Sequence, residues 1–444
     1  MIRNKYFIKT FGCQMNTSDS ERIAGFLELH KFKPAKDINS ADLVVFNTCG
    51  VRQMAEDRAY GQIHNLRKKY PQIKIILTGC LANREDVQKR LKDKVDLFFP
   101  INQFELFENF IIKNYLKITK LKIKNSVQKD ISPTQENIAY LSIDPKRTNK
   151  HQTFVPIMTG CNNFCSYCVV PYARGREASR PANEIIKEVK GLAKNGFKEI
   201  VLLGQNVNSY KDGKTNFSQL LKKIDAIPGN FWIQFLSNHP KDVTDEMIET
   251  VAKCEKVCEC FHLPIQSGSN EILRRMNRKY TAEQYLKLVE KIKRAYQKYR
   301  PEAPYAITSD IIVGFPRETK KQFLDSAEIM REAKYDMVFF GQYSPRPGTA
   351  AWNMHDNISK LEKVNREKYL NEILKKTSFE NNKKYVGKAL DVLIESYKNG
   401  FYFGRTRTMK NVKLKSKRKN LIGKIVKVKV TKANIWNLEA RLES

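Results

Sequence analysis

Three cysteines near the middle of the chain, Cys161, Cys165 and Cys168, form a Cys-x3-Cys-x2-Cys run behind an apolar segment. A structural zinc ion takes four protein ligands, and no nearby His or Cys supplies a fourth at the usual spacing. Three thiolates suit a 4Fe-4S cluster instead, because its fourth iron is then left for an outside ligand. The alternatives are three reduced thiols in a tight loop or an incomplete zinc site. The run predicts a cluster with an open iron.

A second set of three cysteines, Cys13, Cys49 and Cys80, follows short apolar runs in the N-terminal quarter of the chain. These runs, of strand length, are Lys5–Phe11, Leu43–Thr48 and Lys74–Thr78. Helical patterns at Ser18–Leu29 and Gln53–Lys69 alternate with them, which predicts an open parallel α/β sheet. The carboxyl ends of parallel strands share one edge, so the three cysteines should meet there. We infer a second 4Fe-4S cluster with an open iron; the alternative is three small buried hydrophobic side chains.

Between about residues 150 and 340, strand-like and helical patterns alternate six times. The apolar strands are Phe154–Met158, Ile200–Leu203, Trp232–Leu236, Phe261–Ile265, Tyr305–Val313 and Met337–Phe340. Helical patterns between them include Glu184–Lys194 and Asn270–Lys298. Six units without a seventh and eighth predict an open, partial (β/α)6 barrel, in which functional residues crowd the carboxyl ends of the strands. Polar or glycine residues do follow each strand, as at Gly204-Gln205-Asn206.

The tail from Asn381 to Ser444 carries 17 Lys and Arg against 4 Asp and Glu. Its strand-like runs are Ala389–Glu395, Phe401–Gly404, Val412–Leu414 and Ile425–Val430. A small basic all-β barrel is a common platform for RNA backbone contacts and base stacking. The residues predicted to contact RNA are Arg405, Arg407, Lys417, Arg418 and Lys419. The alternative is a solvated β-module with an exposed basic loop.

Composition points the same way. The 444 residues include 80 Lys and Arg against 47 Asp and Glu, a formal charge of +33, which attracts polyanions such as nucleic acid. The alternative is a solvated surface that is simply rich in Lys. No run of 18 apolar residues and no signal peptide is apparent, so a cytoplasmic chain without a membrane partner is expected. Nine cysteines in that compartment favour metal ligation over disulfides.

Some reactive side chains have no predicted role. Cys254, Cys258 and Cys260 form a further run whose spacing suits a cluster poorly, so spare thiols are favoured over a third metal site. His239 and His262 are interpreted as structural histidines, because a lone His is more often satisfied by its neighbours than used as a ligand or base.

Taken together, the motifs resemble those of the methylthiotransferases of the radical S-adenosylmethionine (SAM) superfamily over nearly the whole chain. Besides the central cysteine run, with Tyr167 before its last cysteine, the matching stretches are Gly12–Asn16, Asp19–Glu21, Asn47–Arg52, Cys168–Gly175, Leu203–Asn208, His262–Ser269 and Tyr343–Thr349. The resemblance implies an N-terminal cluster domain at 1–118, a linker at 119–146, a radical SAM core at 147–378 and an RNA-binding TRAM domain at 381–444.

The resemblance also implies how the cysteines are used. In this family the cluster on Cys161, Cys165 and Cys168 binds SAM and cleaves it to a 5′-deoxyadenosyl radical, which takes hydrogen from C2 of an adenine. The cluster on the N-terminal cysteines holds the sulfur, methylated by a second SAM, that enters at this carbon. No catalytic residue is assigned beyond the cluster ligands. The expected SAM contacts are Tyr167, Gln205, Asn206, Asp310 and Gly314.

Among the branches of the family, the motifs favour the one that modifies N(6)-isopentenyladenosine at position 37 of tRNA, next to the anticodon. Val51-Arg52 is the most useful separator from the branch that modifies an aspartate of a ribosomal protein. The alternatives are that branch, the branch acting on threonylcarbamoyl-adenosine, and a non-catalytic iron-sulfur RNA-binding sensor. Two residues depart from the family pattern: Arg317 stands where Gly is usual, and Gln53 where Glu is usual. The implied partners are the tRNA, an electron donor such as flavodoxin or ferredoxin, and a sulfur source.

Overall fold

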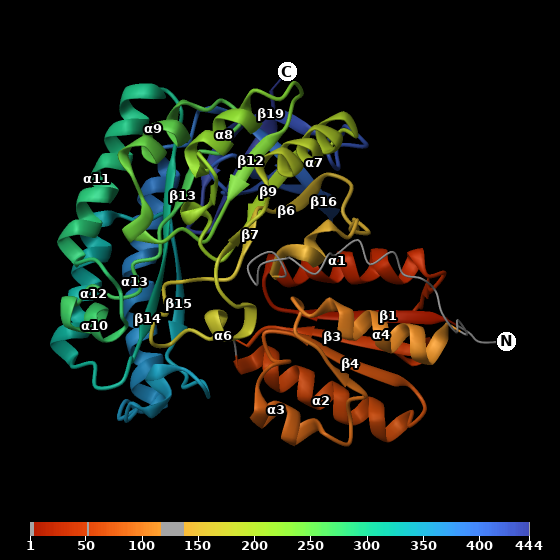
Figure 1. Cartoon of the computed structure of the whole chain (residues 1–444). Helices are drawn as coiled ribbons and strands as arrows, with labels where there is room; N and C mark the ends of the chain where they lie inside the picture. Colours follow the sequence, from red (N-terminus) through yellow and green to blue (C-terminus); the bar gives the residue numbers. More distant parts are fainter. Residues whose placement is uncertain (1–3, 51–52, 117–136, 444) are drawn as a thin grey trace.

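The computed structural model describes residues 4–50, 53–116 and 137–443 (Figure 1). The N-terminal part is a parallel sheet of strand order β2-β1-β3-β4-β5, which confirms the predicted open sheet. Its elements are β1 (Lys5–Phe11), α1 (Gln14–Leu29), β2 (Lys33–Pro34), β3 (Leu43–Thr48), α2 (Gln53–Lys69), β4 (Lys74–Gly79), α3 (Glu85–Leu91), β5 (Leu97–Phe98) and α4 (Phe104–Tyr115). The first four residues of β3 are an unbroken apolar run because the strand is covered on both faces: Leu43 and Val45 face one core, and Val44 and Phe46 the other.

Helix α1 begins at Gln14, earlier than the predicted start at Ser18. Ser18 is fully buried inside the helix, where its hydroxyl accepts a hydrogen bond from Arg22 at 2.7 Å. The N-cap residue is Cys13 itself, whose side chain caps no backbone N–H. A Ser followed by Glu three residues later imitates a capping box in the sequence, and here it is overridden by the position of the cysteine at the sheet edge.

The central part confirms the predicted partial barrel. Its six parallel strands are β6 (Gln152–Pro156), β9 (Glu199–Leu203), β12 (Trp232–Phe235), β13 (Cys260–His262), β14 (Ala306–Val313) and β15 (Met337–Gln342). They form two three-stranded sheets, β6-β9-β12 and β13-β14-β15, which an isolated parallel bridge from Ile233 to Val257 connects. The covering helices are α7 (Ala182–Lys194), α8 (Phe217–Asp225), α9 (Asp245–Lys253), α10 (Asn270–Arg275), α11 (Ala282–Tyr299) and α12 (Lys320–Ala333).

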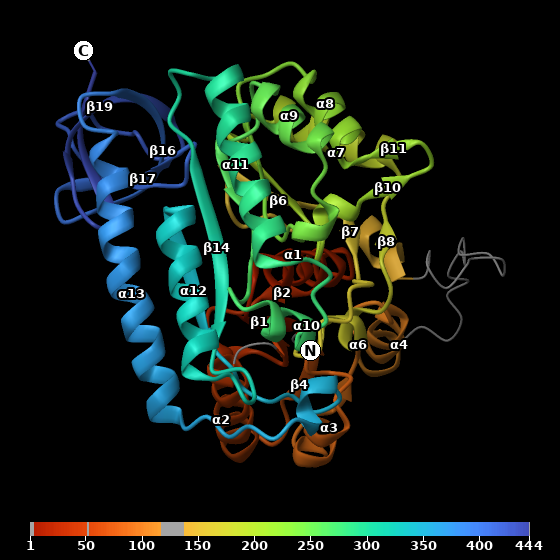
Figure 2. The same ribbon diagram turned by 90° about the vertical axis from the view of Figure 1, so that its left-hand side faces the viewer.

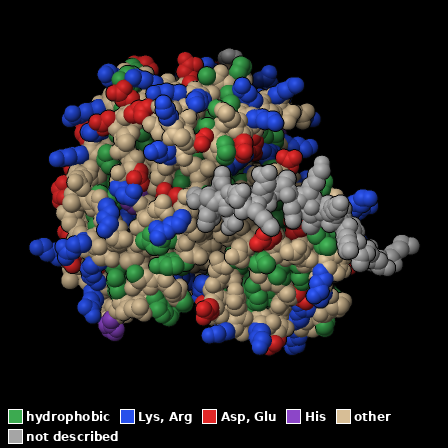
Figure 3. All heavy atoms as spheres, in the orientation of Figure 1, with side chains coloured by type: hydrophobic (Ala, Val, Ile, Leu, Met, Phe, Trp, Pro, Cys, Tyr) green, Lys and Arg blue, Asp and Glu red, His purple; other side chains and the backbone are tan. Residues whose placement is uncertain are grey.

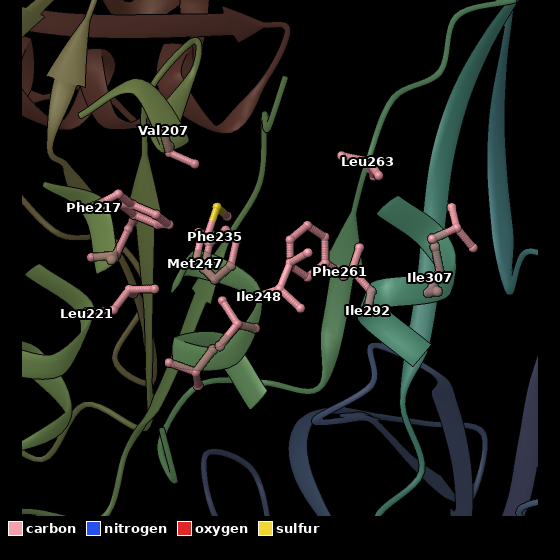
Figure 4. Close-up of a cluster of buried hydrophobic side chains, with 14 of the residues drawn as sticks. Val207, Phe217, Leu221, Phe235, Met247, Ile248, Phe261, Leu263, Ile292 and Ile307 are labelled. Carbon is pink, nitrogen blue, oxygen red and sulfur yellow. The ribbon is translucent and has the colours of Figure 1, made fainter. Parts of the chain in front are cut away.

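The largest hydrophobic core lies between these strands and helices (Figure 4). Alternate strand residues point outward to the helices, so that Phe235 of β12 and Phe261 of β13 meet edge to face with ring centroids 6.3 Å apart. Helix residues such as Leu221 and Ile292 complete the contact and are fully buried. On β6 and β9 the alternate residues Phe154, Val201 and Leu203 form a separate small cluster with Met15 of α1.

The single helical pattern predicted at Asn270–Lys298 is two helices, α10 and α11. Asn277 takes a left-handed conformation with φ of 58°, which ends α10. Thr281 then starts α11 with a reciprocal capping box to Gln284. The short segment between the helices lies against the central cysteine loop, described below.

The C-terminal part is a closed barrel of strand order β16-β17-β18-β20-β19. Its strands are β16 (Ala389–Lys398), β17 (Phe401–Thr406), β18 (Asn411–Lys415), β19 (Ile425–Ala433) and β20 (Asn437–Leu442). The sequence indicated the first four. Strand β20, Asn-Leu-Glu-Ala-Arg-Leu, was missed although it alternates polar with apolar residues; Leu438 and Ala440 lie in the core and Leu442 packs against it.

Helix α13 (Lys360–Lys383) runs along the central barrel to the C-terminal barrel (Figure 2). Three buried or half-buried ion pairs fix the two barrels together: Arg405–Glu199 at 3.1 Å, Arg407–Glu259 at 2.8 Å and Lys410–Asp336 at 2.8 Å. All three carboxylates stand at or just before the first residue of a barrel strand. The C-terminal barrel therefore covers the end of the central barrel opposite to the strand carboxyl ends.

Part of the predicted linker at 119–146 lies outside the described residues. Its described part packs onto the N-terminal sheet domain, because Tyr140 and Leu141 are both buried in the core beside Phe107. Within the described ranges, no helix is both long and apolar enough to cross a membrane.

Arg317 adopts a left-handed backbone with φ of 59°, and its amide donates to Asn357 at 2.8 Å. A residue with a Cβ is strained in this region by about 1 kcal/mol, whereas Gly adopts it freely. We expect Arg317→Gly to raise the free energy of unfolding by about 0.5–1 kcal/mol, offset in part by the greater entropy of the unfolded chain. Denaturant titration of both proteins tests this. The exposed Lys321→Gly, inside α12, should instead destabilise, and destabilisation by both variants would contradict the strain at Arg317.

Candidate active site

The N-terminal cysteines lie at one edge of the parallel sheet. Strands β1, β3 and β4 are in register with Phe11 beside Thr48 and Thr48 beside Gly79, and a cysteine follows each strand end within two residues. A Cβ atom on Gly12, which has φ of 142°, would stand 2.8 Å from the Cβ of Cys49. Only glycine fits there, so the sequence signal of Gly before Cys reflects a real close approach of the neighbouring cysteine.

A polar network lies directly behind this edge. The thiol of Cys13 donates to Oδ1 of Asn16 at 3.1 Å, and Nδ2 of Asn16 donates to Oδ1 of Asn47 at 2.7 Å. Asn47 in turn donates to the carbonyl of Asn16 and to the hydroxyl of Ser20. Asn16 and Asn47 are completely buried. These bonds couple the start of α1 to the end of β3 and hold the cysteine edge in one arrangement.

The central cysteine loop runs from Gly160 to Cys168, before helix α6 (Val170–Arg174). The amide of Cys168 donates to the carbonyl of Cys165 at 2.9 Å, which closes the loop into a tight turn. Asn277, from the break between α10 and α11, donates to the carbonyl of Phe164 at 2.9 Å. Phe164 has φ of 45°, so this bond braces a strained backbone between the cysteines.

A buried cation contacts the central cysteines. Arg278 donates to Sγ of Cys165 at 3.4 Å and to the carbonyl of Pro264 and the hydroxyl of Tyr280. No carboxylate in the described part of the chain forms an ion pair with it. A buried guanidinium without a carboxylate is costly, and cysteine sulfur that binds a metal as thiolate would supply the charge that balances it.

The chemistry of the cysteine thiols fits an iron-sulfur cluster. Burial raises the pKa of Cys161 to about 11 and that of Cys168 further, so both thiols are protonated at neutral pH until a metal displaces the proton. In the described ranges, no three His, Cys, Asp or Glu side chains gather closely enough to hold a single metal ion. A four-iron cluster is larger than one ion and needs its cysteines farther apart. Three thiols without a fourth ligand, beside a buried cation, fit that group.

The two cysteine sets face each other across the junction of the two domains. The pKa of Cys168 is raised first by burial, then by Cys165, and also by the charge of Cys80 from the other set. Arg174, at the end of α6, forms an ion pair of 2.6 Å with Asp19 of α1, and the two side chains are 3% and 0% exposed. The carboxyl-end edges of both sheets therefore meet in one place.

The predicted SAM contacts differ in whether neighbouring protein groups already satisfy them. Tyr167 packs against a small apolar cluster that includes Met276 and Phe315, and burial raises the pKa of its phenol well above the usual value. Gln205 and Asn206 follow β9, and each has a buried side-chain oxygen without a hydrogen-bond partner. Such unpaired oxygens fit a polar cofactor that would supply the missing donors.

The other two predicted contacts are held by neighbours. Asp310 lies 3.5 Å from Nε2 of His262, whose Nδ1 is 2.9 Å from the Thr308 hydroxyl. Gly314 has φ of 70°, its amide donates to Glu318 at 2.8 Å, and a Cβ there would strike the side chain of Lys363. Gly314 thus has a clear structural role in seating its loop.

Sequence reasoning assigned no site role to three buried polar residues in or after the third barrel strand, one of them His239, which it interpreted as a structural histidine. Gln234 and Asn238 each have an unpaired side-chain oxygen, and Nε2 of His239 is unpaired as well. Burial, assisted by Arg278 and Lys241, lowers the pKa of His239 to about 2, so this ring is neutral. The sequence signal for them was that they lie in or directly after the third barrel strand, and polar residues in such places are also typical of an ordinary turn.

The predicted RNA contacts divide into two groups. Arg405 and Arg407 bind Glu199 and Glu259 of the central barrel, so their guanidinium groups hold the two barrels together, while RNA contact by these two stays a prediction. Lys417, Arg418 and Lys419 are exposed in the loop after β18. Figure 3 shows Lys and Arg side chains spread over the visible face of the molecule, not gathered in a single patch.

The remaining cysteines, Cys254, Cys258 and Cys260, are all buried. Cys258 packs between Trp232 and Leu393 at the junction of the two barrels, and burial raises the pKa of Cys254 to about 11. Buried thiols of raised pKa are inert, in agreement with the interpretation as spare thiols. The separator Val51-Arg52 lies outside the described residues.

Comparisons with known proteins match three regions of the chain to three protein families. Residues 5–100 match Uncharacterized protein family UPF0004, residues 155–330 match the Radical SAM superfamily, and residues 383–442 match the TRAM domain. A tRNA-2-methylthio-N(6)-dimethylallyladenosine synthase of Clostridium tetani is 42% identical over 98% of this chain and 96% of its own length. One of Thermodesulfovibrio yellowstonii is 42% identical over 99% and 98%.

Solved structures give a more distant likeness. The radical S-adenosylmethionine methyltransferase TsrM of Kitasatospora setae, with tryptophan substrate and a SAM analog bound, has a TM-score of 0.53. It is 14% identical, and the match covers 79% of this chain and 75% of that one. At this level of identity the likeness concerns the fold alone.

Proposed function

The chain belongs to the tRNA-2-methylthio-N(6)-dimethylallyladenosine synthases of the radical SAM superfamily, and from this membership we propose which residues carry its reaction. It is a tRNA methylthiotransferase that uses SAM and 4Fe-4S clusters. We assign Cys161, Cys165 and Cys168 to the cluster that binds SAM. The second cluster is assigned to the cysteines at the N-terminal sheet edge, Cys13, Cys49 and Cys80.

One observation carries this assignment: two sets of three cysteines stand at facing sheet edges, joined by the buried ion pair of Arg174 with Asp19. A hydrogen must leave C2 of the adenine and a sulfur must enter there, so the two clusters have to face one carbon. An adenine C–H bond offers no acidic proton for a general base, and when bound the cofactors supply the radical and the sulfur that the side chains lack.

The chain's own residues then bind, orient and exclude water. Arg278 balances the charge of the central thiolates, and Asn277 fixes their loop. The unpaired oxygens of Gln205 and Asn206 are available to donors on SAM, and Tyr167 would pack beside its adenine. We retain Asp310 and Gly314 as weaker SAM contacts, because neighbouring side chains already occupy them.

The substrate and partners complete the proposal. The substrate is N(6)-isopentenyladenosine next to the anticodon of tRNA, as the names of the relatives support. Chemistry of this kind needs an electron donor such as flavodoxin or ferredoxin and a sulfur source, and we place it in the cytoplasm with tRNA. We keep the domain limits 1–118, 147–378 and 381–444, noting that helix α13 runs through the last boundary.

Mass spectrometry of tRNA nucleosides from cells that lack this protein tests the substrate. Unthiolated isopentenyladenosine should accumulate, and its 2-methylthio form should disappear. Loss of a methylthio group from threonylcarbamoyl-adenosine or from a ribosomal protein instead would assign the chain to another branch. Unchanged nucleosides together with tRNA binding would point to a sensor.

Exposed cations of the C-terminal barrel should contribute to tRNA binding. We expect the triple change of Lys417, Arg418 and Lys419 to alanine to weaken tRNA binding and to make it less dependent on salt. The slope of log affinity against log salt concentration should fall by up to about two units, because fewer phosphate contacts form and fewer counterions are released on binding. Binding isotherms at several salt concentrations measure the slope. Changing Lys287, Arg294 and Lys298 of α11 to alanine removes the same charge elsewhere and is the control. Equal slopes for both triple variants would move the RNA site away from this loop.

A further inference from the structure

We propose that Arg174 is a positioning residue that couples the two cysteine sets, with its pair to Asp19 setting their separation and its spare N–H group donating to sulfur at the N-terminal set. The inference rests on the proposed function, since it concerns the transfer of that sulfur. Arg174 is the last residue of the short helix that follows Cys168, and Asp19 lies in the helix whose N-cap is Cys13. Each partner is thus tied to a different cysteine set.

The ion pair is the most enclosed one between the two domains. Its atoms Nη2 and Oδ2 are 2.6 Å apart, and the side chains are 3% and 0% exposed. Separating the two partners of a desolvated ion pair is costly, because each would be left as an uncompensated buried charge. The contact therefore fixes one separation of the two sheet edges, unlike an exposed pair that solvent can replace.

Each partner of this pair also has an unused polar atom. Nη1 of Arg174 and Oδ1 of Asp19 are buried without a hydrogen-bond partner, as is the hydroxyl of nearby Tyr140. Buried donors left unpaired are rare and costly, so the site is built to receive an acceptor. Among the described residues, no protein group accepts a hydrogen bond from Nη1 of Arg174.

The charges around Arg174 indicate what that acceptor is. Burial lowers the pKa of the guanidinium, but Asp19, Cys80, Tyr140 and Cys13 raise it more, so that it lies well above its usual value. Two of these four groups are thiols of the N-terminal set. Anionic sulfur, as a cysteine thiolate or as sulfur bound to an open iron, is the acceptor that these neighbours offer.

Three variants separate the two roles of Arg174. Arg174→Lys keeps a cation for Asp19 but removes the planar second donor, Arg174→Met removes both, and Asp19→Asn removes the carboxylate at equal size. Arg405→Met breaks the comparable ion pair at the far end of the barrel and is the matched control for general loosening. The two readouts are the magnetic interaction between the reduced clusters, by electron paramagnetic resonance, and methylthio product against 5′-deoxyadenosine.

We expect Arg174→Met to weaken the magnetic interaction and to lower methylthio product by about 100-fold, since a displacement of about 1 Å costs that much, while 5′-deoxyadenosine formation stays within about threefold. Arg174→Lys should keep the interaction but lose about tenfold in product. Asp19→Asn should follow Arg174→Met, and Arg405→Met should leave the interaction unchanged. Unchanged interaction and product in Arg174→Met would overturn the inference. Wild-type protein that cleaves SAM without forming methylthio product would instead overturn the proposed function.

Discussion

Replacing Cys165 by alanine is expected to abolish reductive cleavage of SAM, lowering 5′-deoxyadenosine formation by more than about 1000-fold. Cys165 is the middle cysteine of the central loop, and its sulfur receives the hydrogen bond from Arg278 at 3.4 Å. Without it the loop offers two thiols, too few to retain a cluster with one open iron. Arg278 would also lose its hydrogen bond to this sulfur. Chromatographic measurement of 5′-deoxyadenosine with excess dithionite tests the prediction.

A control for this experiment is available in the same domain. Cys254 is buried, reduced and outside the proposed sites, so Cys254→Ala also removes a thiol but should leave SAM cleavage near the wild-type rate. Cleavage that survives in Cys165→Ala would show that SAM is bound elsewhere. A loss in both variants would reflect instability of the barrel.

The second large effect is expected at Cys49, where SAM cleavage should be retained and insertion of the methylthio group should be lost. Cys49→Ala should form 5′-deoxyadenosine at close to the wild-type rate but lower methylthio product by more than about 1000-fold. Cys49 stands at the end of β3, in the N-terminal sheet domain, where Gly12 approaches it closely. Its loss should therefore spare the central loop and remove only the holder of the sulfur.

Liquid chromatography with mass spectrometry of digested tRNA and of the SAM products measures both half-reactions in one sample. A Cys49 variant that still forms the methylthio nucleoside would show that sulfur is delivered without this cysteine. Ser18→Ala is a useful control, because it changes a buried residue of the same domain that is not a proposed ligand.

Local patterns in the sequence were sufficient to predict the N-terminal sheet, the partial barrel and four of the five strands of the C-terminal barrel. The run Leu43–Thr48 begins with four apolar residues because both faces of the strand are covered, and the structure places β3 at the same limits. The errors arose where a local signal competed with a distant contact. Ser18 imitates a helix cap, yet it is buried beside Arg22, and the helix starts at the cysteine.

The candidate site was predictable only as a set of residue types at strand ends. The pairs that organise it join distant positions: Arg174 meets Asp19 across 155 residues, and Arg405 meets Glu199 across 206. No local spacing encodes such contacts, so the pairing of Arg405 in the basic tail with a buried carboxylate was not predicted from the sequence. Arg278 was missed for the same reason, since it contacts Cys165 across 113 residues.

Iron and sulfide content after anaerobic reconstitution tests the central claim, that six cysteines hold two separate clusters. The account predicts about eight irons per chain for the wild type, and about four when Cys161, Cys165 and Cys168 are all changed to alanine. The corresponding change of Cys13, Cys49 and Cys80 should also leave about four. A fully reconstituted wild-type protein with only about four irons would contradict the account.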